Sequence, residues 1–321
     1  MNSRAPAPHA SPLILLKDHG ITLPADCPPR IVAEVVRIVS LLWLDGEIVS
    51  RDKFFIDPSD EGLLFARGIW ECTRIYKGVP WLWPLHIERL LRTASLLEID
   101  VGPERLPDSK QVGDFVGALT SMDVLVRLNV TAGRRGKPDS GIVWMTASLP
   151  PAPVASIRLQ GHQTPILKDL PYLAWKTFQY GSRLQAGQQA QRAGFDSALL
   201  LDPEGNLLEA AHANIFIRLP DGWVTPPAAE GALLPGTVRQ HLLANAPLPI
   251  REQPIPYALL SEAREAFISN SNVGIVPVAQ IDDRTFPIGS ETVELLRWLH
   301  PGGRETLALL QNEGRAVRDE R

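Results

Sequence analysis

The run Pro150-Pro151-Ala152-Pro153 constrains the fold of this sequence most, because such a cluster of prolines marks a loop. Strand and helix patterns stand on both sides of it, so we interpret it as a linker. A chain of 321 residues makes one large or two ordinary domains, and the linker favours two. We predict an N-terminal extension at residues 1–37, a small α/β domain at 38–149, the linker at 150–156, a larger domain at 157–300 and a polar tail at 301–321.

Strand and helix patterns alternate along both domains, which indicates an α/β (α+β) fold. Residues 124–131 alternate cleanly, with Val126, Leu128 and Val130 on one face and Arg127 on the other. Residues 31–36 fit either a helix turn or an edge strand. The remaining patterns predict helices at 85–97, 182–193 and 236–245, and strands near 41–47, 69–76, 141–149, 197–201, 214–219, 223–225, 265–270 and 272–278.

Charge and composition argue against several classes of partner. Net charge is −4 and there is no dense basic run, so nothing indicates nucleic-acid binding. The apolar stretches are too short to span a bilayer, and residues 1–11 lack the apolar core of a signal peptide. Cys27 and Cys72 form neither a metal-ligand cluster nor a disulfide framework. We therefore expect a cytoplasmic protein with no membrane, nucleic-acid or metal partner.

Lys176 is the residue with the strongest indication of chemistry. Its neighbours Trp175, Phe178 and Tyr180 predict partial burial, although a lone lysine is most often a solvated surface residue. Lys168 is a rival, in a Leu-Lys-Asp setting that matches no motif.

The order of motifs around Lys176 resembles the class IV aminotransferases, which are fold-type IV enzymes that use pyridoxal phosphate (PLP). That family includes branched-chain aminotransferases, D-amino-acid transaminases, R-selective amine transaminases and aminodeoxychorismate lyase. The resemblance spans roughly residues 41–290 and implies two domains with PLP at their junction. Six segments carry it: Gly68-Ile69-Trp70-Glu71, the His-x-x-Arg-Leu of 86–90, Lys176, the Glu-Ala-Ala-His-Ala-Asn-Ile-Phe of 209–216, the Leu-Pro-Gly-Thr-Val-Arg of 234–239, and residues 269–278.

The resemblance implies a role for each cofactor residue. Lys176 forms a Schiff base with the cofactor, and Glu209 faces the ring nitrogen and keeps it protonated. The sequence departs from the family pattern at two positions. Gln179 stands where the family usually has Asn, and Val238 stands where it often has Thr. The phosphate is held by a guanidinium, a hydroxyl and two amides at a helix N-terminus, from Arg89, Ser271, Thr237 and Val238.

The resemblance also implies substrate residues. Trp70 stands where relatives have Tyr or Phe, at a position that lines the substrate pocket. Arg127 matches an arginine of branched-chain enzymes, and its alternative reading is a solvent-facing strand residue. In some relatives, an arginine of the loop after this strand holds a substrate carboxylate, often across a dimer interface. Lys137 aligns nearest to that position, with Arg134 or Arg135 as shifted alternatives.

The implied function is that of a homodimeric aminotransferase, which moves an amino group between an amino acid or amine and a keto acid. The alternative on the same fold is aminodeoxychorismate lyase, which converts 4-amino-4-deoxychorismate into 4-aminobenzoate and pyruvate. A catalytically silent PLP-binding protein is a third reading. Lys176 and Glu209 serve the first two reactions alike, so both stay open.

Overall fold

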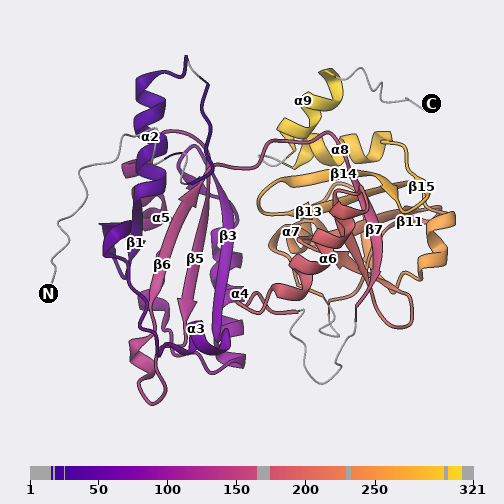
Figure 1. The fold of residues 1–321 in the computed structure, drawn as a ribbon. Coiled ribbons are helices and arrows are strands. Elements are labelled where there is room, and N and C mark those ends of the chain that lie inside the picture. Colours follow the sequence, from indigo (N-terminus) through magenta and orange to yellow (C-terminus); the bar gives the residue numbers. More distant parts are fainter. Residues whose placement is uncertain are drawn as a thin grey trace, which may run out of the picture.

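Two β-sheets, one in each half of the chain, organise the fold, and a linker crosses between them (Figure 1). The computed structural model describes residue 16 and residues 19–24, 26–164, 174–228, 233–299 and 303–312. The first part of the predicted extension, most of the predicted tail and Lys168 lie outside these residues.

The first sheet of the described chain is antiparallel and six-stranded, in the order β2-β1-β6-β5-β3-β4. Strand β3 pairs with β5 along almost its whole length, from Gly68 opposite Thr131 to Ile75 opposite Val124. The strand predicted near 41–47 is confirmed as β1, which forms a hairpin with β2. The strands are β1 (Leu41–Leu44), β2 (Glu47–Ser50), β3 (Gly68–Tyr76), β4 (Val79–Pro80), β5 (Val124–Thr131) and β6 (Val143–Ser148).

Helices α4 and α5 pack on one face of this sheet, in a core that holds Val126, Leu128 and Val130 of β5 at 0% exposure. The predicted alternation of β5 is therefore confirmed, and it directs Arg127 and Asn129 to the opposite face. The helices described in this half are α2 (Pro29–Ser40), α3 (Glu61–Phe65), α4 (Trp83–Leu96) and α5 (Ser109–Leu119), with 3-10 turns at Arg51–Lys53, Pro103–Arg105 and Pro138–Ser140.

Helix α2 decides between the two readings of residues 31–36 in favour of a helix, with Pro29 at its first position. The Glu34 carboxylate on α2 accepts hydrogen bonds from Thr120 Oγ1 at 2.5 Å and from the amide of Ser121 at 3.1 Å, just past the end of α5. Residues 29–37 of the predicted extension thus pack against α5.

The second sheet closes on itself. Its order is β12-β11-β10-β13-β14-β7-β8-β9, and β9 pairs again with β10, so six strands form a ring from which β11 and β12 extend. Strand β7 runs parallel to both β8 and β14, and β15 pairs with β14. The strands are β7 (Ile157–Gln163), β8 (Ser197–Leu201), β9 (Leu207–Ala210), β10 (Ala213–Leu219), β11 (Gly222–Thr225), β12 (Ile250–Glu252), β13 (Glu265–Asn270), β14 (Gly274–Ile281) and β15 (Arg284–Thr285).

The helices of this half pack on the outside of the ring, each through an apolar cluster. Helix α6 covers β8 through small residues, whereas α7, α8 and α9 surround the stacked rings of Phe216 and Phe267. The predicted helices and strands of this half are confirmed, with shifts of a few residues at their ends. The helices are α6 (Gly181–Arg192), α7 (Thr237–Asn245), α8 (Ser290–Trp298) and α9 (Arg304–Asn312), with a 3-10 turn at Tyr257–Ser261.

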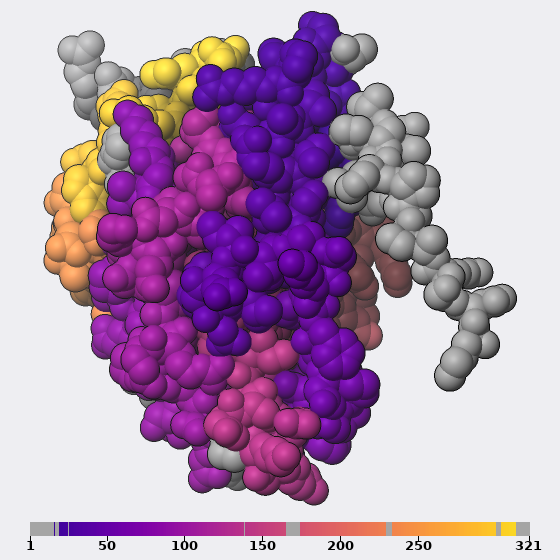
Figure 2. Space-filling model, turned by 90° about the vertical axis from the view of Figure 1, so that its left-hand side faces the viewer, coloured from indigo at the N-terminus to yellow at the C-terminus, as the bar shows by residue number. Residues whose placement is uncertain are grey.

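Figure 2 looks onto the first half, whose early segments cover this face while the C-terminal segments lie behind its left edge. Within the described ranges, no helix combines the length and the apolar character that crossing a bilayer requires. The described side chains also include no group of three or more His, Cys, Asp or Glu placed to bind a metal ion.

Candidate active site

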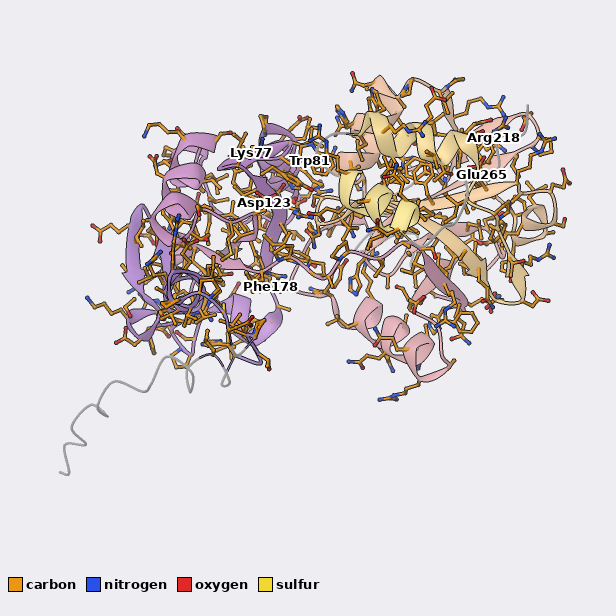
Figure 3. The ribbon with its side chains drawn as sticks, turned by 90° about the horizontal axis from the view of Figure 1, so that it is seen from above. Lys77, Trp81, Asp123, Phe178, Arg218 and Glu265 are labelled. Carbon is orange, nitrogen blue, oxygen red and sulfur yellow. The ribbon has the colours of Figure 1, made fainter. Side chains whose placement is uncertain are left out.

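Lys176 lies on the seam between the two halves, because its segment pairs with the free edge of β3. The Trp70 amide donates to the Lys176 carbonyl at 2.9 Å, and the Phe178 amide donates to the Gly68 carbonyl at 2.9 Å. A side chain at position 68 would meet the Phe178 ring, since a Cβ there would lie 2.4 Å from it. Figure 3 shows Phe178 on the side of the first half that faces the second. The glycine of the Gly-Ile-Trp-Glu segment therefore makes room for the lysine segment.

The Lys176 amine is buried against aromatic rings. Its Nζ lies 3.8 Å from the centroid of the Trp70 ring and 6.0 Å from that of Tyr180. Burial, followed by the positive charge of Arg89, lowers the pKa of the Lys176 amine to about 8. A substantial fraction of this amine is neutral near physiological pH, which is the form that acts as nucleophile or base.

Glu209 faces the same cavity from the second sheet. Glu209, Asn214 and Ser269 are directly paired on β9, β10 and β13, so their side chains share one face. Glu209 Oε1 accepts hydrogen bonds from the Leu234 amide at 2.9 Å and from Arg183 at 2.6 Å. Within the described part of the chain, Glu209 Oε2 has a single long contact, 3.4 Å from Asn214 Nδ2. This oxygen keeps acceptor capacity on the cavity side.

The N-terminus of α7 forms an anion site beside them. The amides of the first helical turn have no acceptor inside a helix, and no side chain caps this one. Its N-cap, Gly236, lies so close to Asn214 that a Cβ would come within 2.0 Å of the amide oxygen. Because the start of the helix is uncapped, the amides of Thr237 and Val238 are available to a ligand. The side chains of both residues are buried.

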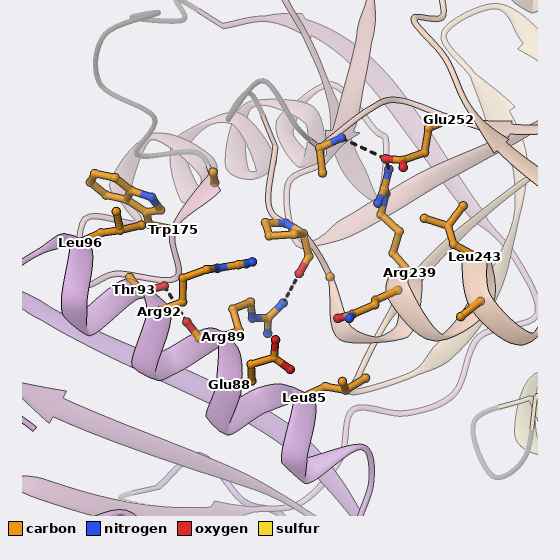
Figure 4. A pocket seen from close by; sticks show the side chains of 16 residues that line it. Leu85, Glu88, Arg89, Arg92, Thr93, Leu96, Trp175, Arg239, Leu243 and Glu252 are labelled. Atoms are coloured by element: carbon orange, nitrogen blue, oxygen red, sulfur yellow. Dashed lines mark hydrogen bonds and ion pairs between the residues drawn. The ribbon is translucent and has the colours of Figure 1, made fainter. Parts of the chain in front are cut away.

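Arg89 reaches this site from α4 and is fixed by the first half. Its Nε and Nη2 donate to the Glu71 carboxylate at 2.8 and 2.6 Å, and its Nη1 donates to the Pro235 carbonyl at 2.9 Å (Figure 4). A guanidinium has five N–H groups, so two remain for an anion. Burial alone would raise the pKa of Glu71, but Arg89 and then His86 hold it at about 2.

His86 links the same carboxylate to α7. Its Nδ1 lies 2.7 Å from Glu71 Oε2, and its Nε2 lies 3.2 Å from Thr237 Oγ1. Burial lowers the pKa of His86, so the ring is neutral. An ionised carboxylate only accepts, and Nδ1 therefore carries the proton while Nε2 accepts from the Thr237 hydroxyl. That leaves the Thr237 amide, rather than its hydroxyl, for an anion.

One cavity brings six of the predicted residues together. Lys176, Glu209 and Arg89 line it with Thr237, Val238 and Ser271, as do Tyr180, His212, Ser269 and Asn270. The Ser271 hydroxyl donates to the Cys72 carbonyl at 2.6 Å, whereas the buried Ser269 Oγ has no hydrogen-bond partner in the part of the chain that the structure describes. Arg89 and Gly236 also line a larger cavity of about 700 Å³ between α4 and α7 (Figure 4).

The three predicted substrate residues do not lie together in the structure. The Arg127 guanidinium lies 3.7 Å from the centroid of the Trp70 ring, which also contacts Lys176. Lys137 lies elsewhere, in a surface pocket with Arg134, Arg135, Leu64 and Phe65. Two of the three residues are thus near the candidate site within one chain, and Lys137 is not.

Sequence reasoning missed several side chains of the site. Glu71 and His86 stand inside quoted motifs, but the sequence did not indicate that they join Arg89 to α7. Ser269 begins the quoted segment 269–278, but nothing marked its side chain as part of the site, and Arg183 carries no local signal. Arg183 follows Lys176 in an ordinary polar helix, and only the tertiary structure turns it toward Glu209.

An amine, an acid and an uncapped helix N-terminus line one cavity, and this combination suits a phosphorylated cofactor. The profile of the family described as amino-transferase class IV matches residues 68–281. A protein of Methanocaldococcus jannaschii with the provisional name of branched-chain-amino-acid aminotransferase is 30% identical over 259 residues, which cover 76% of this chain and 88% of that protein.

Two further relatives carry other names. D-alanine aminotransferase of Bacillus licheniformis is 25% identical over 258 residues, covering 77% of this chain and 90% of that protein. The structure of 4-amino-4-deoxychorismate lyase from Pseudomonas aeruginosa matches with a TM-score of 0.70 at 25% identity, covering 81% of this chain and 98% of that one. The chain belongs to the class IV aminotransferases, which are fold-type IV enzymes that use PLP. The predicted family, fold class and cofactor are confirmed.

The residues present fit this cofactor. An anion site with two free arginine N–H groups suits its phosphate, and the open oxygen of Glu209 suits its ring nitrogen. Among the described residues, the buried Ser269 hydroxyl has no partner, so it is available to a polar ligand in the cavity.

Proposed function

We propose that the protein is a transaminase in which Lys176 binds PLP and moves the proton, while Glu209 faces the ring nitrogen. The observation that carries this proposal is the shared cavity of Lys176, Glu209 and the N-terminus of α7. The name of the Methanocaldococcus jannaschii relative, which is 30% identical, supports transamination. The substrates would be an amino acid or amine and a keto acid.

The chemistry divides among the residues of the cavity. When bound, PLP supplies a carbonyl carbon that takes up the amino group and a ring that accepts electron density. The neutral form of Lys176 Nζ would take the proton from the substrate Cα and pass it to the carbonyl carbon that PLP supplies. Glu209 Oε2 keeps a proton on the ring nitrogen. Arg89, Ser271 and the first amides of α7 hold the phosphate.

We place the substrate side of the site at Trp70 and Arg127. The Trp70 ring contacts both the Lys176 amine and the Arg127 guanidinium, and its indole N–H donates to the Thr177 carbonyl at 2.9 Å. Burial lowers the pKa of Arg127, but a guanidinium stays charged in proteins. A fixed guanidinium near the reactive amine suits a substrate carboxylate.

We further propose a homodimer in which Lys137 serves the site of the partner subunit. Lys137 is remote from Lys176 within one chain and lies beside a group of exposed apolar side chains, which we call the apolar patch. A second copy that covers the patch would remove it from water. The apolar patch consists of Leu63, Leu64 and Phe65 of α3, at 61%, 55% and 55% exposure.

The test is an absorbance titration of the PLP-loaded enzyme with D- and L-alanine, L-glutamate, L-leucine and R-1-phenylethylamine. Conversion of the PLP band to the pyridoxamine phosphate band by one donor would support transamination and name the chirality. Lys176→Ala should abolish both the lysine-bound PLP band and turnover, whereas Lys110→Ala, at an exposed helix position, should change neither. Full turnover in Lys176→Ala would sink the proposal.

The second candidate function is aminodeoxychorismate lyase, favoured by the 25% identity to the Pseudomonas aeruginosa enzyme over nearly its whole chain. It predicts a PLP-loaded protein that is inert to every amino donor and releases pyruvate from 4-amino-4-deoxychorismate. Rapid conversion by any one donor would argue for the transaminase instead.

A further inference from the structure

Arg183 occupies a costly position for a cation. It lies in the first turn of α6, where the positive end of the helix dipole opposes another positive charge. Its side chain is only 4% exposed, so the guanidinium is almost fully removed from water. A charge in such a place requires a close partner of opposite sign.

The partner is the proposed acid of the active site. Arg183 Nη2 donates to Glu209 Oε1 at 2.6 Å, and the Leu234 amide donates to the same oxygen at 2.9 Å. Two donors occupy Oε1, while the Asn214 contact to Oε2 is long, at 3.4 Å. Arg183 therefore helps to decide which carboxylate oxygen is left for a ligand.

The charge of Arg183 acts across the cavity. Burial is the main cause that lowers the pKa of Lys176 and of His212, and the positive charge of Arg183 adds to it in both. The guanidinium also lies 5.4 Å from the ring centroid of Tyr180. Burial opposes the charge of Arg183, but the Glu209 carboxylate raises the pKa of Arg183 above its ordinary value. The Arg183 guanidinium is thus charged and lies close to the reacting groups.

We propose that Arg183 is a positioning residue that fixes Glu209 and weakens the hold of Glu209 on the proton of the PLP ring nitrogen. The inference rests on the proposed role of Glu209. A carboxylate stabilises a proton on the ring, and a guanidinium paired with that carboxylate opposes it. The ring nitrogen then loses its proton more easily, and the ring is a weaker electron acceptor than a permanently protonated ring. Among the described residues, the polar and titratable groups around this pair include Asn214, Tyr180, His212, Lys176 and the Leu234 amide.

The experiment follows the ring nitrogen directly. Apoenzyme is loaded with PLP that carries a heavy nitrogen isotope in its ring, and the NMR signal of that nitrogen is recorded against pH. Arg183→Gln should raise the proton affinity of the ring by roughly one pH unit, about tenfold. Arg183→Lys, which retains the charge, should stay near the wild type. Arg192→Gln, at an exposed position on the same helix, is the matched control and should not move the signal.

Each outcome separates this inference from the proposed function. A ring signal unchanged in Arg183→Gln but shifted toward the neutral form in Glu209→Gln overturns the role of Arg183 and leaves that of Glu209. A signal unchanged in both variants overturns the role of Glu209 as well. Loss of the lysine-bound PLP band in Lys176→Ala tests the proposed function independently of either result.

Folding of the variants is followed by thermal unfolding, because removing one partner of a buried ion pair is destabilising. If Arg183→Gln does not fold, Arg183→Met removes the same charge and keeps the packing of the methylene groups. A wild-type ring that stays fully protonated over the whole pH range in which the protein is folded would also overturn the inference, since no weakening would then exist.

Discussion

The amine of Lys176 is held between its charged and neutral forms by opposing neighbours. Burial and the charge of Arg89 favour the neutral amine, whereas the Glu71 carboxylate favours the ammonium ion, and the balance lowers the pKa of Lys176 to about 8. Burial by contrast raises the pKa of the Cys72 thiol to about 11, so the thiol stays protonated beside the amine. The same environment thus makes the lysine more reactive as a base and the cysteine less reactive as a nucleophile.

At the scale of this residue, attachment of PLP to the apoenzyme should depend on pH. Only the neutral amine attacks, so the rate should rise with pH and level off above about 8, rather than near the ordinary lysine value of 10.5. Stopped-flow absorbance of PLP mixing with apoenzyme measures the rate. A profile that still rises steeply well above pH 8 would mean that the amine is solvated.

Strand β3 is the element that joins the two halves of the site. At its start it pairs with the Lys176 segment, and further on the Ser271 hydroxyl donates to the Cys72 carbonyl at 2.6 Å. Between these contacts it places Glu71 under Arg89. A displacement of this strand would therefore move the lysine, the phosphate site and the arginine together.

Gly68 tests this role of β3. Gly68→Ala places a methyl group 2.4 Å from the Phe178 ring and should push the Lys176 segment away, lowering stability by about 1–3 kcal/mol and weakening PLP binding. Gly117→Ala is the matched control, because nothing lies within 4 Å of its Cβ and it sits inside α5. Urea unfolding and PLP titration measure the two effects. Equal behaviour of the two variants would contradict the close packing at Gly68.

The Glu71 carboxylate, which contacts Arg89 and His86, should make the stability of the protein depend on pH. Its folded pKa of about 2 lies below the ordinary 4.5, so the stabilisation is fully present above pH 4.5 and is lost as pH falls toward 2. The difference corresponds to roughly 3 kcal/mol. Glu71→Gln should be less stable than the wild type at neutral pH, and the gap should narrow below pH 4.5.

Denaturant unfolding at several pH values measures this gap. Glu88→Gln, at an exposed position on α4, is the control and should follow the wild type. A gap for Glu71→Gln that stays constant through the acid range would show that the carboxylate does not gain its stability from being ionised beside Arg89.

At the scale of the whole molecule, the cavity belongs to neither sheet alone. The first half supplies Arg89 through α4, and the second supplies Lys176, Glu209 and the N-terminus of α7. Figure 3 shows the two halves side by side, with the junction between them. The proposed dimer adds a third contributor, because Lys137 lies away from this junction in its own chain.

Subunit complementation tests that arrangement. Lys137→Ala and Lys176→Ala should each be impaired as homodimers, but a mixed dimer would contain one site free of both substitutions. Mixing after dissociation and reassociation should therefore restore part of the activity. Leu64→Glu in the apolar patch should weaken the dimer in sedimentation experiments, with Val154→Glu in the exposed linker as control. Failure of the mixture to regain activity would place Lys137 outside the partner's site.

Local sequence patterns predicted many of the helices and strands and most residues of the candidate active site. The alternation of β5 follows from side chains on successive residues pointing to opposite faces, and the Pro-Gly before α7 indicates a helix start. The motif around Lys176 was recognisable because a lysine, an acid and a phosphate site each need particular residue types in a fixed order. These features depend on short stretches of chain.

The tertiary structure alone decided how those stretches meet. The closing of the second sheet by the β9–β10 pair sets Glu209 beside Asn214 and Ser269. The edge of β3 receives a segment from the other half, and this contact buries Lys176 and lowers its pKa. Arg183 gives no sign of its role in the sequence, because ion pairing depends on distance in space and not on spacing along the chain.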